Sequence, residues 1–101
     1  MQNVEIDLRV LKNAVNAVLD HLMEDVGLEK VKIDDKEDFY WNCEAPDMYD
    51  TSRKPIEVSV GRLSDDVHFI NLVKRGQSAD ISYNLVHVAP LLLYIAEKVK
   101  R

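Results

Sequence analysis

The chain has 101 residues, of which 47% are hydrophobic and 31% charged, with three Gly, three Pro and one Cys. These values predict one ordered globular domain over 1–101 and exclude a disordered, fibrous or disulfide-stapled chain. The net charge of −5 is uneven, since residues 1–50 hold 13 acidic and 5 basic residues while 51–101 hold 5 and 8. This acidic first half argues against nucleic-acid binding, which needs a basic face, and favours a basic partner.

The cysteine content and the apolar runs of the sequence indicate the cellular compartment. The single Cys43 cannot form an intramolecular bridge, and the N-terminal residues lack the basic start and apolar run of a secretory signal. The longest apolar run, residues 88–96, is nine residues long, whereas a bilayer span needs about 20. We therefore expect a cytoplasmic protein without a membrane span.

The first predicted element is a helix over 8–26. Its apolar residues recur at steps of three and four, which places them on one face: Leu8, Leu11, Val15, Val18, Leu19, Leu22 and Val26. Asp7 is the expected N-cap and Gly27 the expected end. The heptad-like register is shorter than three heptads, so it favours core packing over a coiled coil. Both a monomer and a homodimer stay open.

A small antiparallel sheet is predicted from two runs. Residues 30–34 and 56–60 alternate polar and β-branched side chains, as half-buried strands do. The second strand should end at Gly61. Together with the helices, these strands predict an α+β fold.

Two further helices are expected, over about 65–75 and 83–99. Ser64 should cap the first of them, with Asp65 and Asp66 at the positive end of its dipole. Asp80 or Ser82 should cap the second, which contains Pro90 and is therefore expected to be kinked. Three helices over a small sheet make up the predicted architecture.

Between the predicted strands lies the segment 34–50, which contains four of the seven aromatic residues and seven of the 18 acids. Tyr and Trp are enriched at interface hot spots, and nearby carboxylates suit a basic, Arg-rich partner. The interface hypothesis takes in six residues of this segment, Tyr40, Trp41, Glu44, Asp47, Tyr49 and Asp50. The alternative is that its aromatic side chains cover the sheet as core. Both interpretations stay open.

Motifs for metal binding, phosphate binding and nucleophilic catalysis are absent from the sequence. The EF-hand pattern fails, because Phe39 stands at the glycine position and Ala45 at the last ligand position. The three histidines, His21, His68 and His87, show no zinc-ligand spacing. No Gly-rich phosphate loop or serine nucleophile turn is present. We predict no catalytic residue, metal or cofactor.

The function predicted from these patterns is a non-catalytic protein-binding module that uses segment 34–50. The alternative is a small-molecule-binding protein or small enzyme with carboxylates in a pocket under the aromatics, drawn from Asp38, Glu44, Asp47 and Asp65.

Short motifs spread over most of the chain also carry a resemblance. Tyr40-Trp41, Tyr49-Asp50 and the run from Gly61 to Asp66 (Gly-Arg-Leu-Ser-Asp-Asp), followed by an apolar closing helix, resemble a group of small bacterial proteins of this length without an established activity. In size and acidity the chain is also similar to immunity and antitoxin proteins, which cover the active surface of a toxin. The resemblance implies a bacterial protein that binds another protein.

Overall fold

The computed structural model describes residues 4–76 and 81–100, apart from the side chains of residues 81–84. The chain divides into two compact units, Met1–Val31 and Lys32–Arg101. The described residues contain helices and an antiparallel pair of strands, which confirms the α+β class. One domain over 1–101 stays a prediction.

The first unit contains the helix α1, Leu8–Asp20, which continues into a π-helical turn, His21–Asp25. The Asp7 carboxylate accepts hydrogen bonds from the backbone N–H groups of Arg9 and Val10 at 2.9 and 3.1 Å, as an N-cap does. Gly27 follows with a φ of 79°, a left-handed conformation that glycine adopts without strain. The predicted helix over 8–26 is confirmed as far as Asp25, with α-helix to Asp20 and a π-helical turn after it.

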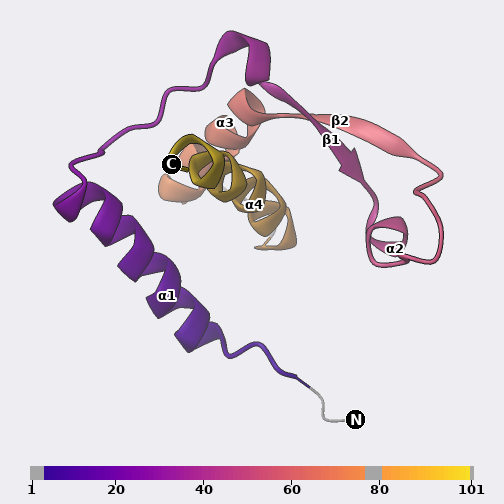
Figure 1. Ribbon diagram of the computed structural model, residues 1–101, viewed down its shortest axis with the longest axis horizontal. Coiled ribbons are helices and arrows are strands. Elements are labelled where there is room, and N and C mark those ends of the chain that lie inside the picture. The colour runs from indigo at the N-terminus through magenta and orange to yellow at the C-terminus, as the bar shows by residue number, and fades with distance from the viewer. Residues whose placement is uncertain (1–3, 77–80, 101) are drawn as a thin grey trace. The chain divides into compact units, whose positions relative to one another are not determined.

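The second unit is organised around two antiparallel strands, β1 (Phe39–Cys43) and β2 (Val58–Arg62). A 3₁₀ turn, Asp35–Glu37, precedes β1, and the one-turn helix α2, Ala45–Met48, lies at the far end of the pair (Figure 1). The strand β2 leads directly into α3, Leu63–Lys74, which packs against α4, Ile81–Lys98.

The predicted first strand is wrong. Residues 30–34 lie in the described part but form no strand, and Phe39–Cys43 pairs with β2 instead. The five-residue alternation at 30–34 is a weak local preference, and strand pairing depends mainly on packing partners. Tyr40 stands opposite Gly61 in the register, where the missing side chain leaves room for its ring. The predicted second strand, 56–60, is shifted to Val58–Arg62.

The start of α3 also differs from its predicted form. The helix begins at Leu63, two residues early, and Ser64 is not its cap. The backbone N–H of Ser64 donates to the Asp38 carboxylate at 2.8 Å, and that of Leu63 donates to the Asp38 carbonyl at 2.7 Å. Asp38, 26 residues upstream, therefore does the capping.

The closing helix α4 runs through Pro90, as predicted, with bounds Ile81–Lys98 instead of 83–99. The predicted caps Asp80 and Ser82 lie outside the part whose side chains are described. Near its C-terminal end, the Tyr94 hydroxyl donates to Glu37 at 3.0 Å and accepts from the Asp34 backbone N–H at 3.2 Å. Lys98 pairs with the same Glu37 carboxylate. These contacts attach the turn before β1 to α4.

In the described part of the chain, the buried residues are Leu63 and Asp66, with 3% and 1% of their surfaces exposed. Both lie in the first turns of α3, where the sheet meets the helices. The core of the second unit is therefore centred on the junction between β2 and α3.

Candidate functional site

The two faces of the β1–β2 pair are chemically different. Alternation along β1 puts Phe39, Trp41 and Cys43 on one face, and the register places Val60 and Val58 of β2 opposite the last two of these. We call these five residues the outer sheet face. Their side chains are apolar, and 79% of Trp41 and 57% of Val60 remain exposed.

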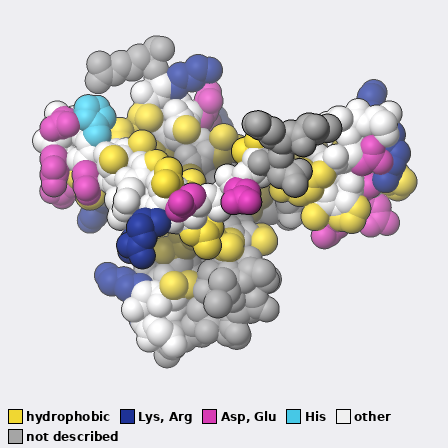
Figure 2. Space-filling view, turned by 90° about the horizontal axis from the view of Figure 1, so that it is seen from below, with side chains coloured by type: hydrophobic (Ala, Val, Ile, Leu, Met, Phe, Trp, Pro, Cys, Tyr) yellow, Lys and Arg dark blue, Asp and Glu magenta, His cyan; other side chains and the backbone are white. Residues whose placement is uncertain are grey.

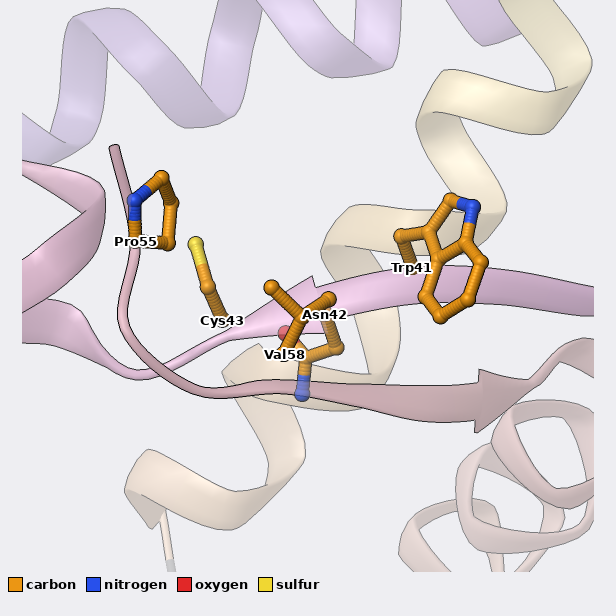
Figure 3. Close-up of a pocket in the computed structure, with 5 residues that line it drawn as sticks. All are labelled: Trp41, Asn42, Cys43, Pro55 and Val58. Carbon is orange, nitrogen blue, oxygen red and sulfur yellow. The ribbon is translucent and has the colours of Figure 1, made fainter.

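Part of the outer sheet face is hollowed. An open cavity of about 460 Å³ is lined by Trp41, Asn42, Cys43, Pro55 and Val58. Figure 3 shows the side chains of Trp41, Cys43 and Pro55 on the same side of the strands. Around α2, on the right of Figure 2, apolar side chains lie at the surface beside acidic and basic ones. Large contiguous apolar patches are uncommon on the surfaces of monomeric proteins.

The inner face of the pair attaches the sheet to the helices. The Tyr40 hydroxyl donates to the Asp66 carboxylate at 2.8 Å, and Nδ1 of His87 contacts the other oxygen of the same group. The His87 ring in turn stacks on Phe69, with ring centroids 4.3 Å apart. Burial raises the pKa of Tyr40, and the hydrogen bond to Asp66 raises it further. We call Tyr40, Asp66 and His87 the buried polar cluster.

The Asp66 and His87 side chains of the buried polar cluster are almost closed to solvent. A carboxylate that orients an imidazole also occurs in catalytic sites, and here Tyr40 occupies the second carboxylate oxygen. Only 2% of the Asp66 side chain and 12% of the His87 side chain are exposed. One carboxylate thus connects β1, α3 and α4, and its two hydrogen-bond partners compensate its burial.

The structure separates the six residues of the interface hypothesis. Trp41, Glu44 and Tyr49 are exposed, with 80% of Tyr49 open to solvent. Tyr40 points inward to Asp66, because it alternates with Trp41 along the strand. The remaining two, Asp47 and Asp50, are used within the loop that follows α2.

That loop is held by one arginine. Arg53 pairs with Asp47 at 2.7 Å and with Asp50 at 3.2 Å, and the Ile56 backbone N–H donates to Asp47 at 3.2 Å. Hydrogen bonds from the Ser52 hydroxyl and amide lower the pKa of Asp50, and the bond from Arg53 adds to them. Both carboxylates therefore hold the approach to β2 in place.

The carboxylates of the pocket hypothesis are not brought together in one pocket. The Asp38 carboxylate accepts from the Ser64 backbone N–H, and the Asp47 carboxylate pairs with Arg53. Asp65 is exposed in the first turn of α3. A hydrogen bond from the Ser64 hydroxyl lowers the pKa of Asp38, and the Ser64 amide and Arg62 add to this. Glu44 lies with Glu57 beside a second open cavity of about 400 Å³. Within residues 4–76 and 81–100, no three potential ligands gather as a metal site would require.

The sequence reasoning missed the role of Asp66, which it explained as a first-turn acid. Tyr40, Asp66 and His87 are separated by more than 20 residues from one another, so no spacing pattern connects them. Only the register of β1 and the packing of α3 on α4 bring them together.

Comparisons with known proteins were made with the whole chain. No protein-family model, no curated protein and no solved structure matches it. The resemblance to small bacterial proteins accordingly stays a prediction. Across the described helices, none combines the length and the apolar character that crossing a membrane requires.

Proposed function

We propose that this chain is a non-catalytic protein-binding module and that the outer sheet face is its contact surface. The observation that carries the proposal is the exposure of Trp41, at 79%, in the middle of an apolar strand face. Trp is the residue type most enriched in binding hot spots, and it is rarely left exposed in an apolar patch without a partner.

Alternation along β1 supports this assignment. Tyr40 attaches the inner face to α3 through Asp66, so Phe39 and Trp41 on the other face take no part in that attachment. The core of the second unit and its outer sheet face therefore use different residues. A partner could bind the outer face without disturbing the buried polar cluster.

The chemistry around the face favours an apolar partner surface that carries basic groups. The carboxylates of Glu44 and Glu57 line the second cavity, which Val58 shares with Asn42 and Ser59 of the opposite face, and the indole of Trp41 can stack with a guanidinium. An Arg side chain offers both the charge and the flat surface for such a site. A bacterial, cytoplasmic protein of the immunity or antitoxin type, which neutralises a basic enzyme surface, fits this description.

The test is affinity capture from the native cytoplasm with the wild type, Trp41→Ala and a matched control, Leu93→Ala. Leu93 is 72% exposed on α4 and outside the outer sheet face. We expect one partner to be captured by the wild type and by Leu93→Ala but lost with Trp41→Ala. The free energy of unfolding of Trp41→Ala should stay within about 0.5 kcal/mol of that of the wild type, as for other surface changes.

Two results would refute the proposal. The first is a partner retained equally by Trp41→Ala and the wild type, which would place the contact elsewhere. The second is a large loss of stability in Trp41→Ala, which would make the indole part of the core.

A further inference from the structure

Within the described residues, the strand β1 has a hydrogen-bonded neighbour on one side, since the sheet of the second unit is the pair of β1 and β2. An edge strand presents a row of backbone N–H and C=O groups with which a further strand can pair. Two strands alone are marginally stable in water, and a third strand adds to their stability. Both outer edges of the pair therefore have the geometry to accept a third strand.

The register shows which backbone groups of β1 point outward. The Leu63 N–H donates to the Asp38 carbonyl at 2.7 Å, so these two residues form a hydrogen-bonded pair. Such pairs alternate with non-hydrogen-bonded pairs along an antiparallel ladder, which puts the even-numbered residues of β1 in the hydrogen-bonded pairs. The N–H and C=O groups of Phe39, Trp41 and Cys43 therefore point away from β2. In the described part of the chain, these groups take part in no backbone hydrogen bond outside the strand pair.

The two edges differ in what keeps a third strand away. Natural edge strands often carry charged side chains or Pro, which discourage pairing with another chain. The strand β2 contains Arg62, and Pro55 and Glu57 stand shortly before it. The strand β1 consists of Phe, Tyr, Trp, Asn and Cys, without a charged residue or Pro. The edge of β1 is therefore the one that is open to a further strand.

We propose that the outward edge of β1 binds an extended segment of a second protein as a third, antiparallel strand. The inference rests on the proposed function, because it specifies how a partner of the outer sheet face is held. In this mode of recognition, backbone hydrogen bonds to Phe39, Trp41 and Cys43 supply the attachment, and alternate side chains supply the specificity. Apolar side chains at alternate positions of the segment then continue the outer sheet face.

The charge at the end of β1 favours a segment that carries a basic residue. Glu44 follows β1 directly, is exposed, and does not cap α2 with its side chain. It lines the second cavity together with Glu57, so two carboxylates are available to an Arg or Lys of the added strand. A second copy of this chain lacks that complement. When two β1 strands pair antiparallel over their whole length, Asp38 of one copy stands opposite Glu44 of the other, and like charges directly opposite each other are destabilising.

The probe is a synthetic heptapeptide, acetyl-Arg-Val-Thr-Val-Thr-Val-Arg-amide, titrated into the full chain. Trp41 is the single tryptophan of the sequence and the peptide has no aromatic residue, so the indole fluorescence reports binding. The central Val of the peptide lies opposite Trp41 in a hydrogen-bonded pair, so its amide points toward β1, whereas the Thr amides point away. N-methylation of the central Val removes one hydrogen bond and puts a methyl group into the contact. It should weaken binding more than about tenfold, and N-methylation of a Thr less than about threefold.

Two variants of the protein test which edge is used. Cys43 and Val58 stand opposite each other in a non-hydrogen-bonded pair, so the N–H of each points outward. Pro at such a position leaves the β1–β2 ladder intact and removes the outward donor. Cys43→Pro should weaken binding of the peptide more than about tenfold, whereas Val58→Pro and the side-chain control Cys43→Ala should retain it. Circular dichroism and the urea midpoint verify that each variant is folded; if Cys43→Pro is not, the methylated peptides decide.

The results distinguish strand addition from other modes of contact. No fluorescence change up to about 1 mM peptide, or equal weakening by the two methylations, would overturn the inference. So would a loss of binding with Val58→Pro in place of Cys43→Pro. A homodimer in sedimentation that Cys43→Pro disrupts would assign the edge to a second copy instead. None of these results depends on the capture experiment with Trp41→Ala, so strand addition and the proposed contact surface can fail separately.

Discussion

Replacing Tyr40 by Phe removes one hydroxyl from the buried polar cluster and almost nothing else. That hydroxyl donates to Asp66 at 2.8 Å, and Asp66 is 1% exposed, so no solvent molecule can easily take its place. A hydrogen bond to a charged group contributes about 1.5–3 kcal/mol to stability. Because His87 remains on the other carboxylate oxygen, we expect a loss of about 2 kcal/mol. For a chain of this size the thermal midpoint would fall by about 10 °C.

The assay is thermal and urea unfolding of Tyr40→Phe beside Tyr49→Phe. Tyr49 is 80% exposed, so removing its hydroxyl should change the unfolding free energy by less than about 0.5 kcal/mol. A Tyr40→Phe protein as stable as the wild type would refute the reasoning, since Asp66 would then not depend on this donor. So would an equal loss in both variants.

The pH dependence gives a second check on Tyr40. Its pKa is raised in the folded state, chiefly by burial, so folding favours the protonated phenol. The resulting stability is fully present below the pKa of an unfolded tyrosine, about 10, and is lost as the pH rises above it. The difference between the wild type and Tyr40→Phe should accordingly shrink above about pH 10.

Two further changes test the same junction. Gly61→Ala should cost about 1–3 kcal/mol by overpacking, because a methyl group at this position would overlap the Tyr40 ring; a urea midpoint equal to that of the wild type would show that the ring does not lie there. Asp38→Asn should flatten the loss of stability in acid. The pKa of Asp38 is lowered by Ser64 and Arg62, so its contribution is present above the ordinary Asp value of about 4 and disappears as the pH falls below it. An acid unfolding curve that keeps the wild-type shape in Asp38→Asn would contradict this.

The acids of segment 34–50 have mostly structural roles in this fold. Asp38 caps α3, Glu37 accepts from Tyr94, and Asp47 and Asp50 hold Arg53. The negative charge of the segment is therefore partly neutralised within the chain. The contact surface that we propose, the outer sheet face, is apolar.

Local chemistry in the sequence determined the helices. The spacing of Leu8, Leu11 and Val15 and the Asp7 cap predicted the first residue of α1 correctly, because both signals act within a few positions of each other. The closing helix was likewise found across Pro90, since its apolar residues keep their period on both sides.

Tertiary structure decided the sheet and the roles of its side chains. Residues 30–34 alternate polar and apolar side chains in the sequence whereas 39–43 do not, and the choice of β1 depends on Tyr40 meeting Gly61 and Asp66, which lie more than 20 residues away. The same pairing fixes which aromatic residues face outward, so Trp41 is exposed while Tyr40 is inside. Contacts between distant residues also give Asp38 its capping role at α3 and place Asp66 in the core. A short sequence pattern reflects only the local preference for helix or strand, whereas contacts between distant residues form only when the chain is folded.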